Sequence, residues 1–342
     1  MKKHLEKVLV TGGAGYVGSH TAIVLAEAGY EPLIVDNFCN AKMQNIKLME
    51  QLIKRRIIVY KSDCTNVKAM EKIFVKEKDI AGVIHFAAFK SVRESVKEPL
   101  LYYRNNIGAL TGTLAAQLKC NVPYMIFSSS CTVYGQAKKL PVKENAPLDS
   151  KPSPYGFSKQ AGERIIEDVC HTSGTVKAIA LRYFNPIGAH PSGKLGEYSL
   201  SRFQNFVPLV MDTLMDPNKH VTILGNDYPT KDGTCVRDYV HVMDVARAHV
   251  QALKYVMSKA APDFDIFNIG LGRGYSVLEI LKEVEKATGQ RIIYKVGPRG
   301  KGDVAATYAD ITKARQVLGF KTEFTIEDAM QHAWKWHITR SK

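Results

Sequence analysis

The sequence lacks any apolar run approaching the ~20 residues that a membrane-spanning helix needs. Its six cysteines form no Cys-x-x-Cys pair and no cluster with histidine, so neither a disulfide framework nor a metal site is indicated. The apolar stretch after the basic start is only Val8–Val10, which is too short for a signal peptide. These absences predict a cytoplasmic protein without a metal and without a membrane partner.

Acidic residues are too few to balance the basic ones. Lys and Arg number 47 against 33 Asp and Glu, a net charge of +14, and such a surplus favours anionic partners. The surplus is nevertheless spread along the chain, and its densest cluster, 54–56, is short. No aromatic residues alternate with basic ones, as a stacking platform for single-stranded nucleic acid requires. We therefore interpret the charge as solvated surface and expect no nucleic-acid partner.

The first half of the chain alternates short apolar strands with stretches long enough for helices. This alternation predicts an α/β fold, a Rossmann-type doubly wound parallel sheet covered on both faces. Up to about residue 180, the expected strands are 7–11, 31–36, 57–61, 82–86, 124–129 and 177–181.

The pattern changes after Arg182. A stretch rich in Pro and Gly, 185–201, is typical of a long irregular loop. We predict a first domain over 1–184 and a smaller mixed α/β C-terminal lobe over 185–342 that binds substrate. A helix over 241–259 is expected to pack back on the first domain. The strands expected in the smaller lobe are 221–224, 265–269 and 291–295.

A glycine motif follows the first strand and opens a helix. Gly12 suits a tight turn, Gly15 allows backbone to approach a pyrophosphate, and Gly18 allows close packing of helix and strand. The next strand ends in Asp36, whose carboxylate suits a ribose diol and repels a 2′-phosphate. Asn37 follows without an adjacent cation, so the motif favours NAD over NADP. The alternative to a dinucleotide site is a glycine turn that binds no ligand.

A second acid, Asp63, ends the third expected strand. Its carboxylate is placed to meet the amino group of an adenine. A helix N-terminal cap explains the same residue equally well.

The spacing Tyr-x-x-x-Lys occurs three times, and one occurrence stands where chemistry is expected. Tyr155 and Lys159 begin a helix and share one face of it. The strand before them ends in hydroxyl residues that include Ser130 and Thr132. A lysine cation lowers the pKa of a nearby phenol from about 10, so that the phenolate can take a proton from a substrate alcohol.

Seven motifs together resemble the extended short-chain dehydrogenase/reductases, and within them the branch that inverts carbon 4 of UDP-linked hexoses. The resemblance covers nearly the whole chain. The motifs are the glycine loop, Asp36-Asn37, His85–Lys90, Phe127–Ser130, Ser153–Lys159, Leu181–Pro186 and Val236–Asp244.

The resemblance implies an NAD-dependent isomerase of galactose metabolism that interconverts UDP-glucose and UDP-galactose through a transient 4-keto sugar. Tyr155 is then the base, Ser130 and Thr132 hydrogen-bond the reacting hydroxyl, and Lys159 holds the nicotinamide ribose. The implied NAD contacts are Gly12, Gly15, Tyr16, Val17, Gly18, Asp36, Asn37, Asp63, Cys64, Phe86, Lys90, Asn105, Tyr155, Lys159 and Tyr183. The implied contacts to the UDP-sugar are Ser130, Thr132, Tyr155, Phe184, Asn185, Asn205, Arg237, Arg299, Asp303 and Thr307. The helices near 97–119 and 158–171 would form a homodimer surface.

Three departures from the family pattern bear on substrate binding. Gly300 replaces the second arginine of an arginine pair, and either Arg299 or Lys301 takes over its contact or nucleotide affinity falls. The loop 197–205 keeps only Asn205 of an asparagine pair. Thr307 stands where relatives carry either a bulky tyrosine or a small residue, so the resemblance implies room for the N-acetyl group of UDP-GlcNAc and UDP-GalNAc.

Three other functions fit the residues less well than epimerisation. A 4,6-dehydratase of this family uses an Asp-Glu pair after the hydroxyl residue, where this chain has Cys131 and Thr132. A decarboxylating or reducing relative fits the later motifs less well. A nucleotide-sensing relative without turnover is disfavoured because Ser130, Tyr155 and Lys159 are all present.

Overall fold

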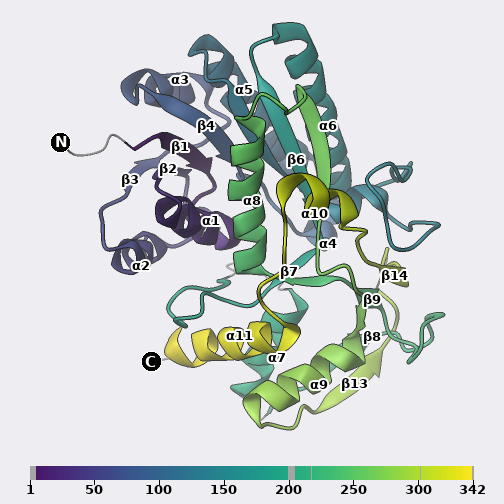
Figure 1. Cartoon of the computed structure of the whole chain (residues 1–342). Coiled ribbons are helices and arrows are strands. Elements are labelled where there is room, and N and C mark those ends of the chain that lie inside the picture. The colour runs from purple at the N-terminus through teal and green to yellow at the C-terminus, as the bar shows by residue number, and fades with distance from the viewer. Residues whose placement is uncertain (1–4, 199–204, 217, 301, 341–342) are drawn as a thin grey trace. The chain divides into compact units, whose positions relative to one another are not determined.

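A computed structural model describes residues 5–198, 205–216, 218–300 and 302–340 (Figure 1). The chain divides into two compact units. The first comprises Met1–Val133, Ser150–Arg182 and Ala246–Phe267. The second comprises Tyr134–Asp149, Tyr183–Val245 and Asn268–Lys342. The chain therefore crosses between the units several times.

A seven-stranded parallel sheet is the framework of the first unit. Its strand order is β11-β6-β5-β4-β1-β2-β3. In the register of the central strands, Leu9 lies opposite Leu33 on one side and Val83 on the other. The predicted doubly wound α/β fold is confirmed. The strands are β1 (Lys7–Thr11), β2 (Glu31–Asp36), β3 (Ile58–Lys61), β4 (Ile80–His85), β5 (Tyr124–Ser130), β6 (Lys177–Tyr183) and β11 (Phe264–Ile269).

The placement of strand 265–269 in the smaller lobe was wrong. The structure puts it at an edge of the seven-stranded sheet, next to β6, as β11. Phe267 and Ile269 are fully buried there. The alternation of apolar residues identifies a strand but not its partner, because pairing is decided by contacts distant in sequence. The last strand expected in the lobe, 291–295, begins later, as β13 (Tyr294–Gly297).

Helices cover both faces of this sheet. On one face, α3 (Val67–Lys76), α5 (Pro99–Lys119) and α6 (Pro154–Ser173) pack an apolar core against the strands. On the other face, α8 (Val242–Val256) comes close, since a Cβ on Gly82 would lie 3.2 Å from the Cδ1 atom of Leu253. Figure 1 shows α8 running beside the strands. The remaining helices that begin near the sheet are α1 (Tyr16–Glu27), α2 (Gln44–Ile53) and α4 (Val92–Lys97).

The second unit has its own core and three small sheets, ordered β10-β7, β12-β9-β14 and β13-β8. The buried carboxylate of Asp238 joins its segments, because it accepts hydrogen bonds from the backbone N–H groups of Leu271, Gly272 and Ala309. Its strands are β7 (Asn185–Ile187), β8 (Val221–Leu224), β9 (Val236–Arg237), β10 (Tyr239–His241), β12 (Tyr275–Ser276), β13 and β14 (Ala306–Thr307). Its helices are α7 (Phe206–Leu214), α9 (Val277–Thr288), α10 (Thr312–Leu318) and α11 (Ile326–Arg340).

No helix in the described part of the chain is long and apolar enough to cross a bilayer.

Candidate active site

In the glycine loop between β1 and α1, backbone segments approach one another more closely than side chains would allow. Gly12 has a φ of +66°, and a Cβ there would lie 2.8 Å from the backbone nitrogen of Ala87. A Cβ on Gly18 would lie only 2.4 Å from the carbonyl oxygen of Gly12. Among the described residues, no side chain caps the first turn of α1, where Tyr16 and Val17 stand. A helix start without a side-chain cap is an arrangement that suits a bound phosphate.

Asp36 ends β2 beside this loop. Its side chain accepts hydrogen bonds from the backbone nitrogens of Ala14 (3.0 Å) and Phe38 (2.8 Å). Burial raises the pKa of Asp36, and the two hydrogen bonds oppose that increase. The bonds fix the carboxylate while its remaining lone pairs can accept hydrogen bonds from a ribose diol.

Asp63 does not cap the following helix. Asn66 is the N-cap of α3 and accepts a hydrogen bond from Ala69. The carboxylate of Asp63 instead accepts from the backbone and hydroxyl of Thr65 and from the Asn37 amide at 3.1 Å. Burial acts to raise the pKa of Asp63, but these hydrogen bonds outweigh it and the pKa is lowered. An ionised carboxylate next to Asn37 fits the adenine contact better than the cap.

Cys64 is a packing residue. Its side chain is buried, and burial raises the pKa of the thiol to about 12. A Cβ on Gly112 of α5 would lie 2.3 Å from the Cys64 carbonyl oxygen, so α5 lies directly against this turn. Any contact of Cys64 with a ligand is made without a thiolate.

The segment after β4 closes over the glycine loop. The backbone nitrogen of Phe86 donates to Thr11 (2.9 Å), and its ring lies 4.6 Å from that of His249. The ammonium of Lys90 stands 5.7 Å from the centre of the Tyr16 ring. The contacts thus bring Phe86 and Lys90 to the glycine loop.

Asn106 is a residue of this site that the sequence analysis missed. It is buried, binds both backbone groups of Phe89, and donates to the Ser158 hydroxyl at 3.0 Å. It also accepts a hydrogen bond from Asn105 (3.0 Å). Asn106 therefore connects the loop after β4 to α6 immediately before Lys159. Two adjacent asparagines inside a long helix are unfavourable for helix formation, and that signal could have revealed it.

Tyr155 and the hydroxyl residues meet where β5 ends and α6 begins. Ser153 caps α6 and Pro154 occupies its first turn, which places Tyr155 at the start of the helix. The backbone oxygen of Thr132 would lie 3.3 Å from a Cβ on Gly156, so this turn touches the start of α6. The Thr132 hydroxyl in turn donates to that of Ser130 (3.0 Å).

Lys159 completes this group. Its Nζ donates to the backbone oxygen of Ser128 at 2.6 Å and lies 5.9 Å from the centre of the Tyr155 ring. Burial lowers the pKa of Lys159 to about 8, and the Glu163 carboxylate opposes the decrease. Burial also lowers the pKa of the neighbouring His85 to about 3, so that ring is neutral. Lys159 is thus the cation placed to stabilise the Tyr155 phenolate.

Residues predicted to hold a UDP-sugar gather in the second unit around β7, β9 and β14. Asn185 lies on β7, bonded through its backbone nitrogen to Asp238 (2.9 Å), and its buried Oδ1 has no partner among the described residues. Arg237 on β9 is half-buried, and within the described ranges its guanidinium donates only to the backbone oxygen of Val236 (2.9 Å). Thr307, which is buried, lies opposite Arg237 in the register of β9 and β14. The guanidinium and the amide are thus available to a ligand.

Two predicted residues precede this group in sequence. Tyr183 ends β6 and is half-buried. Phe184 is buried and donates its backbone N–H to Ile269 at 3.0 Å.

Three further predicted residues have other contacts. Asn205 precedes α7 and donates to Glu197 (2.7 Å). Arg299 is exposed, where it pairs with Asp227 (2.8 Å). Asp303 is exposed, and its backbone nitrogen donates to Gly300. Lys301 and the loop residues 199–204 lie outside the described residues. The structure therefore does not show Arg299 free to replace the missing arginine.

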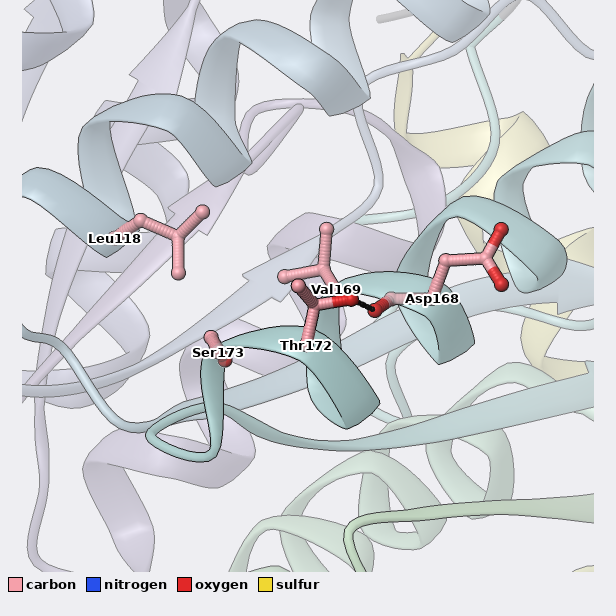
Figure 2. Close-up of a pocket in the computed structure, with 5 residues that line it drawn as sticks. All are labelled: Leu118, Asp168, Val169, Thr172 and Ser173. Atoms are coloured by element: carbon pink, nitrogen blue, oxygen red, sulfur yellow. Dashed lines mark hydrogen bonds between the residues drawn. The ribbon is translucent and has the colours of Figure 1, made fainter.

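A depression of about 310 Å³ lies far from this chemistry, at the carboxyl ends of α5 and α6. Figure 2 shows its lining, where the Thr172 hydroxyl donates to the backbone oxygen of Asp168 at 2.7 Å. From Tyr155 to Thr172 the helix runs roughly 25 Å, so this depression is not the active site. In the described ranges, no group of three or more His, Cys, Asp or Glu could hold a metal ion.

Comparisons with known proteins agree with the predicted family. The family model described as GDP-mannose 4,6 dehydratase matches residues 9–333. UDP-glucose 4-epimerase of Dictyostelium discoideum is 44% identical over 331 residues, covering 97% of this chain and 95% of that protein.

Solved structures of similar proteins indicate the same family. UDP-glucose 4-epimerase from Bifidobacterium longum, in complex with NAD+ and UDP, is 41% identical with a TM-score of 0.93, covering 98% of this chain and 99% of that one. The enzyme from Stenotrophomonas maltophila, with bound NAD and formylated UDP-arabinopyranose, is 37% identical with a TM-score of 0.94, covering 99% of both chains. The chain belongs to the extended short-chain dehydrogenase/reductase family, as a member of its UDP-glucose 4-epimerase branch.

Proposed function

We propose that this chain is an isomerase that interconverts UDP-glucose and UDP-galactose, with NAD as its cofactor and a 4-keto sugar as the transient intermediate. One observation carries the proposal. Tyr155 and Lys159 lie in the first turns of α6, whose start contacts the turn that follows β5 and carries Ser130 and Thr132, and the glycine loop follows β1 of the same parallel sheet. A dinucleotide and an acid–base group are therefore held by one rigid framework.

The residues of the first unit fit NAD. Gly12 and Gly18 let backbone segments pack where a Cβ would not fit, the start of α1 without a side-chain cap suits a pyrophosphate, and the Asp36 carboxylate can accept hydrogen bonds from a ribose diol. When bound, NAD supplies a hydride acceptor and donor for carbon 4 of the sugar. The residues that would hold it are those predicted from the sequence, Gly12, Gly15, Tyr16, Val17, Gly18, Asp36, Asn37, Asp63, Cys64, Phe86, Lys90, Asn105, Tyr155, Lys159 and Tyr183.

Tyr155 moves the proton. As a phenolate beside the Lys159 cation, it accepts the proton of the 4-hydroxyl, which Ser130 and Thr132 orient by hydrogen bonds. The keto sugar then turns about its diphosphate linkage and presents its other face. Tyr155, now a phenol, returns the proton to the new 4-hydroxyl, so the phenolate is regenerated and no external reductant is consumed.

The second unit would hold the UDP portion. The Arg237 guanidinium can contact two phosphate oxygens at once, and the unpartnered Oδ1 of Asn185 can accept from a ligand N–H or hydroxyl. We assign the same task to Phe184, Asn205, Arg299 and Asp303 on the family pattern. Thr307, a small buried side chain on β14, would leave space for an N-acetyl group, so UDP-GlcNAc and UDP-GalNAc are further proposed substrates.

A dehydratase would need an acid after the hydroxyl residue. The side chains at that point are those of Cys131 and Thr132, and neither donates a proton as a carboxylic acid does. A reductase or a decarboxylase would act on a different sugar. A nucleotide sensor would not need Tyr155 beside Lys159.

The test is an assay of purified protein on UDP-galactose without added reductant. We expect UDP-glucose to accumulate, and Tyr155→Phe to abolish its formation while NAD remains bound. Tyr255→Phe is the matched control, because Tyr255 belongs to another Tyr-x-x-x-Lys spacing, on α8. Failure of the wild-type protein to form UDP-glucose would contradict the proposal.

We also propose a homodimer in the cytoplasm. Support for the location is the set of six free cysteines, which is typical of a reducing compartment. Support for the dimer is an exposed apolar face on α4, α5 and α6, where Val96 and Leu100 are 65% and 64% exposed. Phe157, on the same face, is also exposed and its ring lies 5.8 Å from that of Tyr103.

A further inference from the structure

A buried ion pair joins α6 to β6 next to the proposed catalytic group. Arg182 donates from Nε and Nη2 to the two oxygens of Glu163, at 2.8 and 2.6 Å. The side chains of Arg182 and Glu163 are only 3% and 6% exposed. The Ser129 hydroxyl also donates to Glu163, at 2.5 Å. Burying two charges costs free energy that an apolar pair would not cost, so a pair at this position calls for a role beyond stability.

The pair is one helical turn from Lys159. Glu163 follows Lys159 by four residues, which places both on one face of α6. Consecutive serines at the end of β5 connect the two. The backbone oxygen of Ser128 accepts from Lys159, the hydroxyl of Ser129 donates to Glu163, and Ser130 belongs to the proposed catalytic group. The same short strand segment therefore fixes the lysine, the ion pair and the reacting hydroxyl.

We propose that Glu163 and Arg182 are a positioning pair for Lys159, which holds α6 in register with β5 and balances the charge around the ammonium. This inference rests on the proposed function, because it concerns the lysine that stabilises the Tyr155 phenolate. Neither Glu163 nor Arg182 takes part in proton transfer itself.

Glu163 and Arg182 have opposite effects on the pKa of Lys159. Lys159 faces Glu163 and Tyr155 of its own helix and the neutral His85 of β4. The Glu163 carboxylate raises the pKa of Lys159 against the effect of burial, while Arg182 neutralises that carboxylate. Loss of the carboxylate leaves an uncompensated guanidinium and lowers the pKa of Lys159. Loss of the guanidinium leaves an uncompensated carboxylate and raises it.

The experiment compares Glu163→Gln, Arg182→Met and the double variant. The pH dependence of kcat/KM for UDP-galactose is measured, and its alkaline limb reports loss of the Lys159 proton. We expect Glu163→Gln to move this limb by about one pH unit toward acid and Arg182→Met to move it by about one unit toward alkali. The double variant, which carries no unpaired buried charge, should return the limb toward its wild-type position with kcat lowered several-fold and KM little changed.

Asp168→Asn is the matched control, since it removes a carboxylate that pairs with Arg164 on the same helix with both side chains more than half exposed. It should leave the limb unchanged. Single variants that shift the limb in the same direction or not at all, or a double variant with wild-type kcat, would overturn the inference. If a single variant does not fold, the kcat of the double variant alone tests the inference: a lowered kcat supports it and a wild-type kcat contradicts it.

A second readout separates this inference from the proposed function. The phenolate of Tyr155 absorbs in the near ultraviolet, and its titration is the difference between each variant and the same variant carrying Tyr155→Phe. The titration of Tyr155 should shift in both single variants, because each changes the charge around Lys159 and the phenol, and should return toward its wild-type position in the double variant. This result is obtained even with a chain that fails to epimerise UDP-galactose. An unchanged titration in both variants would contradict the inference alone.

Discussion

At the scale of single residues, the chemistry depends on a buried lysine that has no carboxylate bonded to it in the part of the chain that the structure describes. The Nζ of Lys159 meets a backbone oxygen of β5, and its charge remains available to the phenol of Tyr155. Had an acid bonded the ammonium directly, the positive charge would be neutralised and the phenolate would lose its stabilisation. The backbone carbonyl thus orients the lysine and leaves its charge intact.

This arrangement predicts an alkaline limit for activity. Burial holds the pKa of Lys159 at about 8, below its ordinary 10.5, so the ammonium loses its proton as the pH rises through about 8. The rate constant kcat/KM should then fall above that pH, as initial rates across a pH series would show. A rate that stays constant up to the ordinary lysine pKa of 10.5 would contradict it.

Thr307 allows a prediction about substrate choice. Thr307→Tyr places a bulky ring at a buried position on β14 and should remove turnover of UDP-GlcNAc while UDP-galactose is still converted. The ratio of the two rates, measured by chromatography of the nucleotide sugars, should fall by at least an order of magnitude. Ser276→Ala on β12, which lies on the other side of β9 in the same sheet, tests for a general effect on this small sheet. Wild-type protein inactive on UDP-GlcNAc would contradict the substrate proposal.

Single residues also show where prediction from sequence stops. The glycine loop, Asp36, Tyr155 and Lys159 could be identified because motif and chemistry coincide. The choice between cap and ligand for Asp63 could not, since both need a carboxylate after a strand. The structure excludes the cap, because Asn66 caps α3 instead, and the ligand contact stays a prediction.

At the scale of elements, glycines determine how closely α5 packs on the turn after β3. A Cβ on Gly112 would lie 2.3 Å from the backbone of Cys64, whereas one on Gly108, a turn earlier, would make an ordinary 3.4 Å contact with Thr65. Gly112→Ala should therefore cost about 1–3 kcal/mol of unfolding free energy. Gly108→Ala, the control, should cost nothing or stabilise by up to about 1 kcal/mol through helix propensity. Urea unfolding measures both, and equal effects would contradict the packing argument.

Prediction of the strands from the sequence has a similar limit, since it finds the strands but not their partners. Strands 7–11 and 31–36 could be predicted with the observed bounds, because buried parallel strands are continuous apolar runs ended by turn residues. The assignment of 265–269 to the smaller lobe was wrong, because its apolar pattern is the same in either sheet. Only the long-range pairing with β6 distinguishes them.

At the scale of the whole molecule, the exposed apolar face of α4 to α6 predicts association. Leu100→Glu puts a charge on that face and should convert a dimer to a monomer, measured by sedimentation velocity. Val75→Glu is the control, since Val75 is 62% exposed on α3, which is not one of the three helices of this face, and should leave the dimer intact. A wild-type protein that sediments as a monomer would contradict the prediction.

The division into two units also shows what the sequence could not reveal. The change in pattern after Arg182 indicated a second lobe. Segment 134–149 belongs to the second unit although it lies in the middle of the predicted first domain. No local signal marks such crossings, because they depend on which core each segment packs against.

The most direct measurement uses UDP-galactose that carries deuterium at carbon 4. Purified protein is incubated with it in ordinary water without added reductant, and the products are analysed by mass spectrometry and NMR. The proposed reaction predicts UDP-glucose with the deuterium retained at carbon 4. UDP-glucose without deuterium, a 4-keto-6-deoxy product or no conversion would contradict it.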